Sequence, residues 1–139
     1  MGASGRQPVS AARRHSLRVL LCDDSVELRA LLRSAIEAGR DVEVVGEVGD
    51  GDTGVRLAAE RQPDVVVLDL EMPGPSPEAL LKALRRAAPS AALVTFSGHD
   101  PATVAGAAVG DIALHLPKTT DLATAGRAVR DLGRRRSAS

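Results

Sequence analysis

Short apolar runs alternate along the chain with segments whose apolar residues recur at helical spacing. The runs predict five strands, at residues 19–22, 42–48, 65–68, 92–96 and 112–116. The third run reads Val-Val-Val-Leu without a polar residue, which is typical of a central parallel strand covered on both faces.

A helical pattern follows each apolar run. The first helix carries an apolar stripe from Leu28 to Ile36 and ends at Gly39. The third begins with the capping hydroxyl of Ser76 and the first-turn proline Pro77. The remaining helices are predicted at 53–62, 101–108 and 121–132. Five strand-helix repeats predict an α/β fold, with a five-stranded parallel sheet, right-handed crossovers and helices on both faces.

The composition fits one domain with basic ends. The chain has 139 residues, of which 44% are hydrophobic, enough for a single core. Residues 19–132 hold all 18 acidic residues but only 11 of the 18 basic ones, a net charge of −7. We expect a disordered basic tail at 1–16, a domain at 17–133 and a second basic tail at 134–139.

Single features of the sequence exclude several classes of protein. Cys22 is the only cysteine, so no internal disulfide or zinc cluster can form, and we expect it to be a buried strand residue. Asp23-Asp24 cuts short the apolar stretch that an export signal needs, and no run approaches membrane-spanning length. Phe96 is the only aromatic residue, so base-stacking surfaces are missing. The sequence indicates a cytoplasmic protein with no membrane or direct nucleic-acid contact.

Charged and hydroxyl side chains follow the ends of the predicted strands. The first strand ends in Asp23-Asp24, the third in Asp69 and the fourth in Ser97, and Lys118 follows the fifth. Ligands of open α/β sheets bind outside the carboxyl ends of the strands, so these side chains should share one crevice if strands one and three are neighbours. Three carboxylates together require a cation, and oxygen ligands without His or Cys favour Mg²⁺.

Such a crevice suits a phosphoryl group. With Mg²⁺ on one side, the Lys118 ammonium and the Ser97 hydroxyl can contact the remaining phosphoryl oxygens. A carboxylate in the crevice can also act as a nucleophile and form an aspartyl phosphate. Asp69 is the natural candidate, because it ends the central strand between the acidic pair and the side of Ser97 and Lys118.

In their order and spacing, these residues resemble the receiver domain of two-component response regulators. The likeness covers about residues 18–132 and rests on four motifs, namely Cys22-Asp23-Asp24, the segment 67–74, Ser97-Gly98 and Lys118. It implies a flavodoxin-like, doubly wound fold with strand order 2-1-3-4-5. It also implies that Asp69 is the phosphoacceptor and shares in Mg²⁺ binding. Asp24 would be a direct Mg²⁺ ligand, Asp23 a largely water-mediated one, and Glu71 a ligand through its backbone carbonyl. Ser97 would be the switch hydroxyl and Lys118 the phosphate-contacting base.

The sequence departs from the pattern of that family at several positions. His115 stands three residues before Lys118, where the family has an aromatic switch residue, so we treat it either as a switch or as a solvated histidine of an edge strand. Glu71 and His99 occupy positions that in the family tune how long the phosphoryl group lasts. Gly106 and Gly110 weaken the fourth helix and the turn after it.

The resemblance also implies partners. A histidine kinase or phosphotransfer protein would supply the phosphoryl group, and the face formed by the fourth helix, fifth strand and fifth helix would bind targets or form a homodimer. Receivers of this kind usually carry a DNA-binding output domain. We therefore expect that the chain either acts alone through partner binding or is a fragment whose output domain was removed.

Three other interpretations compete with a phosphoacceptor. The first is a Mg²⁺-dependent phosphohydrolase that forms an aspartyl phosphate, for which Glu71 stands where a second acid is needed. The second is a pseudo-receiver that binds partners without phosphorylation. The third rests on residues 49–54, which match the G-x-G-x-x-G dinucleotide fingerprint but follow the second strand instead of the first, so we interpret the match as accidental.

Overall fold

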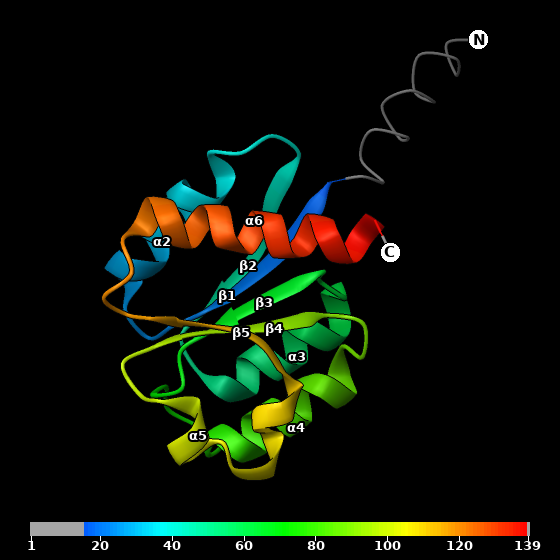
Figure 1. Cartoon of the computed structure of the whole chain (residues 1–139). Helices are drawn as coiled ribbons and strands as arrows, with labels where there is room; N and C mark the ends of the chain where they lie inside the picture. The colour runs from blue at the N-terminus through cyan, green and yellow to red at the C-terminus, as the bar shows by residue number, and fades with distance from the viewer. Residues whose placement is uncertain (1–15, 139) are drawn as a thin grey trace, which may run out of the picture.

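The computed structural model describes residues 16–138, and its five strands form one parallel sheet in the order β2-β1-β3-β4-β5. The predicted fold class and strand order are confirmed. In the labels of Figure 1 the elements are β1 (Leu17–Cys22), α2 (Val26–Glu37), β2 (Val42–Val48), α3 (Gly51–Arg61), β3 (Val65–Leu68), α4 (Pro77–Ala87), β4 (Ala92–Ser97), α5 (Pro101–Val104), the 3-10 helix η1 (Gly106–Asp111), β5 (Ile112–Pro117) and α6 (Leu122–Ala138).

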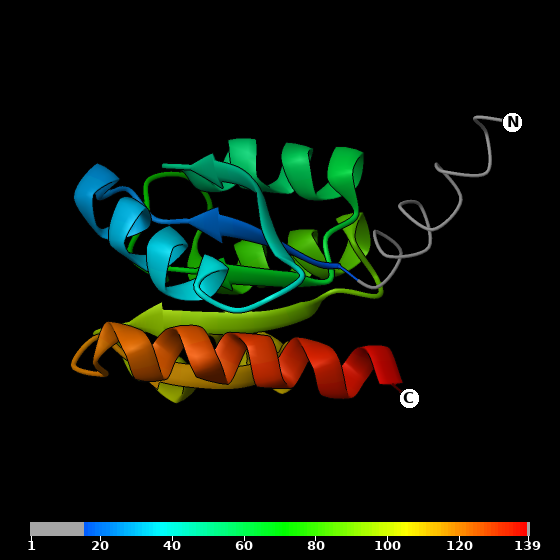
Figure 2. The same cartoon turned by 90° about the horizontal axis from the view of Figure 1, so that it is seen from above.

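Two helical layers cover the sheet. Helices α2 and α6 pack together on one face, and α3, α4 and α5 lie on the other (Figure 1). Seen from above, α6 runs alongside the strands (Figure 2). Alternate residues of each strand feed two apolar clusters, so Leu20 and Leu68 pack toward α3 and α4 while Val19 and Val67 pack toward α2 and α6. All four residues of β3 are buried, as expected for a central parallel strand.

The chain around the fourth predicted helix differs from expectation. The predicted helix at 101–108 is only the single turn α5, and the 3-10 helix η1 follows it. Gly106 breaks the helix because its φ of +55° lies in the left-handed region. The segment that leads into the edge strand β5 is therefore short and irregular.

The last helix is longer than its sequence pattern predicts. The pattern predicts an end at residue 132 and a basic tail at 134–139, but α6 continues to Ala138 and contains Arg134 and Arg136. These two guanidinium groups donate to the backbone carbonyls of Arg40, at 2.7 Å, and Ser90, at 3.3 Å. Such contacts to distant turns hold the extra helical turns against the domain. The predicted tail at 1–16 lies outside the described residues, except for residue 16.

None of the helices in the described part of the chain combines the length and the apolar character that crossing a bilayer requires.

Candidate functional site

The acidic side chains predicted to converge do so at the carboxyl ends of β1 and β3. These strands are neighbours, with Cys22 opposite Leu68 in the register, so the residues that follow them share one edge of the sheet. Carboxylate oxygens of Asp23, Asp24 and Asp69 all lie within 4.8 Å of one another. Asp23 and Asp69 are each only 3% exposed, whereas Asp24 faces solvent. The cluster therefore has two buried members and one open member.

Lys118 bridges the two buried carboxylates. Its Nζ donates to Asp23 Oδ2 and to Asp69 Oδ2, both at 3.0 Å. Partial burial acts to lower the pKa of Lys118, but the hydrogen bonds and charges of the two aspartates outweigh it, so this pKa is raised above its ordinary value. Lys118 thus remains charged at neutral pH.

Local backbone geometry orients the two buried carboxylates. Asp23 Oδ1 accepts a hydrogen bond from the amide of Ser25 at 2.9 Å, and Asp69 Oδ1 accepts one from the amide of Glu71 at 3.0 Å. In each carboxylate, one oxygen therefore accepts a hydrogen bond from a backbone amide and the other accepts one from Lys118. Three carboxylates against one ammonium still leave an excess of negative charge, and a set of hard oxygen donors with this charge fits Mg²⁺.

Ser97 lies at the end of β4 and is 1% exposed. Its Oγ accepts a hydrogen bond from the amide of His99 at 3.2 Å. The His99 side chain in turn lies with its Nδ1 3.1 Å from Glu71 Oε2, and both side chains are about half exposed, at 45% and 47%. The loops after β3 and β4, which follow Asp69 and Ser97, are thus joined by a side-chain contact that sequence spacing did not reveal.

The side chain of His115 contacts β4. Its Nδ1 is 2.7 Å from Oγ1 of Thr95, the residue opposite it on β4, and Thr95 is fully buried. Sequence reasoning did not single out Thr95. The available signal was a lone hydroxyl in the apolar run at 92–96, two residues before Ser97 and hence on the same face of the strand.

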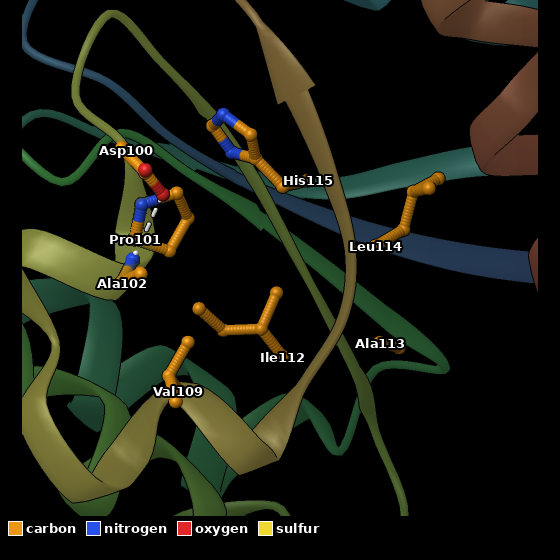
Figure 3. A pocket seen from close by; sticks show the side chains of 8 residues that line it. All are labelled: Asp100, Pro101, Ala102, Val109, Ile112, Ala113, Leu114 and His115. Atoms are coloured by element: carbon orange, nitrogen blue, oxygen red, sulfur yellow. Dashed lines mark hydrogen bonds between the residues drawn. The ribbon is translucent and has the colours of Figure 1, made fainter.

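The ring of His115 lines a surface pocket of about 420 Å³ beside α5, η1 and β5 (Figure 3). The exposed side chain of Val109 also lines the pocket. The other lining residues are Asp100, Pro101, Ala102, Ile112, Ala113 and Leu114. This pocket belongs to the face that the sequence predicts to bind partners.

The glycines at 49–54 serve packing inside this domain. The amide of Gly51 donates to the carbonyl of Pro73 at 3.0 Å, and a Cβ on Gly74 would lie 3.2 Å from the nitrogen of Gly51. The loop after β3 therefore covers the first turn of α3, where a dinucleotide pyrophosphate would have to bind. Cys22 is buried as expected, and burial, aided by the charge of Asp23, raises the pKa of its thiol to about 12.

Comparison with known proteins agrees with this geometry. The family model described as the response regulator receiver domain matches residues 19–129. The nitrate/nitrite response regulator protein NarL of Escherichia coli is 39% identical over 79 residues, which are 57% of this chain and 37% of that protein. A protein-glutamate methylesterase/protein-glutamine glutaminase of Myxococcus xanthus is 39% identical over 111 residues, 78% of this chain and 32% of that protein.

Solved structures give the same result. The signal receiver domain of a NarL response regulator from Mycobacterium tuberculosis superposes with a TM-score of 0.75 at 28% identity, covering 86% of this chain and 97% of that one. The response regulator domain of CheB from Thermotoga maritima gives 0.74 at 25% identity, covering 89% and 98%. The chain thus spans about a third of the length of the two curated relatives but nearly all of the two solved receiver domains. This chain belongs to the family of response regulator receiver domains of two-component systems.

Proposed function

We propose that Asp69 is the phosphoacceptor of this receiver domain and that Mg²⁺ is its cofactor. The observation that carries the proposal is the Lys118 ammonium, 3.0 Å from both Asp23 Oδ2 and Asp69 Oδ2, beside the solvent-facing carboxylate of Asp24. A cation already neutralises part of the charge that a phosphoryl group would bring. The free electron pair of an Asp69 oxygen can then attack phosphorus.

In the proposed reaction, a phosphohistidine of a histidine kinase or phosphotransfer protein is the donor. A bond forms between an Asp69 oxygen and phosphorus, the phosphorus-nitrogen bond breaks, and the imidazole leaves with the electron pair. Bound Mg²⁺ would offset the negative charge that gathers on the transferring oxygens. Asp24, Asp23, Asp69 and the backbone carbonyl of Glu71 would hold it, with Asp24 as a direct ligand and Asp23 acting largely through water.

Ser97 and His115 would transmit the phosphorylated state. Ser97 Oγ would exchange the amide of His99 for a phosphoryl oxygen, while Lys118 would stay on the phosphoryl group. His115 would move from its contact with Thr95 and so reshape the pocket at α5, η1 and β5. This is a population shift between two conformations, read by a target or by a second copy of the chain on the face of α5, β5 and α6.

Glu71 and His99 would set the lifetime of the phosphoryl group. Their contact at 3.1 Å bridges the two loops that flank Asp69 and can limit the approach of water to phosphorus. We infer that the domain acts in the cytoplasm and has no catalytic activity beyond assisting its own phosphorylation and dephosphorylation. It acts either alone through partner binding or as part of a longer protein with a DNA-binding output domain.

The test is intact-mass measurement after incubation with acetyl phosphate and Mg²⁺. Wild type should gain the mass of one phosphoryl group and Asp69→Asn should gain none. Asp100→Asn is the matched control, because this exposed acid caps α5 and is not one of the three clustered carboxylates, and it should label like wild type. An unlabelled wild type would support the pseudo-receiver instead, and continuous release of phosphate without a stable adduct would support a phosphohydrolase.

A further inference from the structure

Arg29 contacts the loop after β1 that carries Asp23 and Asp24, here called the acidic loop. It has no part in the proposed phosphorylation or in the proposed switch. It lies on α2, and its Nη1 donates to the backbone carbonyl of Asp23. Its side chain is 15% exposed, and its Nε is 3.7 Å from Oε1 of Glu47, near the end of β2. Nε itself is buried and has no hydrogen-bond partner among the described residues. A largely buried guanidinium whose Nε has no hydrogen-bond partner is costly, so its placement needs a reason.

Gly49 leaves the space that this guanidinium occupies. A Cβ on residue 49 would lie 3.2 Å from Nη1 of Arg29 and 3.7 Å from the Cα of Asp24. A Cβ at this position would therefore press on the guanidinium, while its contact with Asp24 in the acidic loop would be an ordinary van der Waals contact. Glu47 is held on its other side by Arg33, whose Nη1 lies 2.7 Å from Glu47 Oε2. The first glycine of the 49–54 motif is thus explained by Arg29.

The bonded carbonyl controls the direction of Asp24. The carbonyl of Asp23 and the amide of Asp24 belong to one planar peptide unit, so fixing the oxygen fixes the start of residue 24. Asp23 has a second anchor, because its side chain bonds Ser25 and Lys118. Asp24 is exposed, and among the described residues no hydrogen bond to its carboxylate is seen. The placement of its carboxylate therefore depends on the backbone.

We propose that Arg29, seated in the space left by Gly49, is a positioning residue that aims Asp24 at the bound Mg²⁺. The inference rests on the proposed function, since it assumes that Asp24 is the direct ligand. Positioning by Arg29 and simple electrostatics predict opposite changes in Mg²⁺ affinity when Arg29 is replaced. Removing a positive charge beside a cation site should strengthen Mg²⁺ binding, whereas loss of positioning should weaken it.

The experiment is a Mg²⁺ titration of the unphosphorylated protein, followed by the amide shifts of Ser25 and Glu71 in NMR spectra. The variants are Arg29→Gln, Gly49→Ala and the matched control Arg33→Gln, which removes the same charge from the same helix and from the same acid, Glu47, without touching the Asp23 carbonyl. Gly49→Ala displaces the guanidinium without changing any charge. It also serves as the second variant if Arg29→Gln does not fold, which the amide spectrum reveals directly.

We expect Arg29→Gln to weaken Mg²⁺ binding about tenfold and Gly49→Ala about threefold, with Arg33→Gln within about twofold of wild type. The inference is overturned if Arg29→Gln binds Mg²⁺ as tightly as wild type or more tightly, or if Gly49→Ala has no effect. If wild type itself shows no saturable shift at these amides, the proposed function fails first, and the inference fails with it. Equal weakening by Arg29→Gln and Arg33→Gln would mean that the effect does not depend on the contact with the Asp23 carbonyl, and it would also overturn the inference.

Discussion

The carboxyl ends of β1 and β3 and the face formed by α5, η1 and β5 are built in opposite ways. At the first, Asp23 and Asp69 are buried, and each has its two oxygens bonded to a backbone amide and to Lys118. At the second, one helical turn and a 3-10 helix surround a pocket with an exposed Val109. The charged site is held in place by its bonds, whereas the pocket face has few such restraints.

The contrast fits the different tasks that we propose for the two regions. A group that receives phosphorus must be oriented before the donor arrives, and buried charges keep their orientation only when they are fully bonded. A face that changes conformation needs two arrangements of similar free energy, which short helices, glycines and a single side-chain contact provide. Four perturbations test this difference, from the largest expected effect to the smallest.

The largest effect should come from alkaline pH through Cys22, directly beneath the acidic cluster. The folded protein raises the pKa of this thiol from 9.0 to about 12. Its contribution to stability is therefore complete below about pH 9 and is lost as the pH rises toward 12, because only the unfolded chain then releases the proton. Wild type should lose roughly 3 kcal/mol more than Cys22→Ala between about pH 8 and about pH 11 in denaturant unfolding. Parallel pH profiles of the two proteins would contradict this.

Removal of Lys118 should break the charged site. Lys118→Met leaves Asp23 and Asp69 buried without their shared cation, and we expect a loss of about 2 kcal/mol in the free energy of unfolding at neutral pH. The control Lys82→Met removes an exposed ammonium that pairs with Glu78 at 3.1 Å, and should cost less than about 0.5 kcal/mol. Added Mg²⁺ should reduce the difference in the free energy of unfolding between Lys118→Met and wild type. Equal losses of stability in the two lysine variants would mean that Lys118, between two buried carboxylates, stabilises the fold no more than an exposed lysine does.

Two glycine substitutions test the face formed by α5, η1 and β5. Gly106 has φ of +55°, and a Cβ there would lie 2.5 Å from Oε1 of Glu78, so Gly106→Ala should lower stability by about 1 to 2 kcal/mol. A Cβ on Gly110 would meet no other described atom within 4 Å, and its φ is not left-handed, so Gly110→Ala should raise stability by about 0.5 kcal/mol. Thermal unfolding measures both. A stabilising Gly106→Ala would show that the break between α5 and η1 is not required by the fold.

The smallest effect should come from the contact between Thr95 and His115. Thr95→Val keeps the shape of the side chain but removes the hydroxyl, and we expect a loss of at most about 1 kcal/mol, because His115 is only partly buried. The ring nitrogen shifts of His115 should change at the same time. His115→Phe removes the other partner, so the double variant should cost less than the sum of the two single variants. Additive losses would mean that the two side chains do not interact in solution.

Many of the residues that share the site could be predicted from the residues that follow each strand. In a parallel sheet every strand finishes at the same edge, so Asp23, Asp69 and Lys118 could be placed together once strand and helix alternated along the sequence. The unbroken apolar run at 65–68 likewise predicted a central strand. Partners that arise from side-chain direction could not be predicted, and Thr95, Arg29 and the contact between Glu71 and His99 belong to this class.

The sequence by itself determined the fold class, the strand order through its family resemblance, and the set of acids at one edge of the sheet, because periodicity and strand ends are local properties of the chain. Only the tertiary structure decided where α6 ends, since Arg134 and Arg136 bond carbonyls far away in the sequence. It also decided that Gly49 admits the guanidinium of Arg29. These contacts depend on the distance between packed elements, and a one-dimensional pattern does not contain that distance.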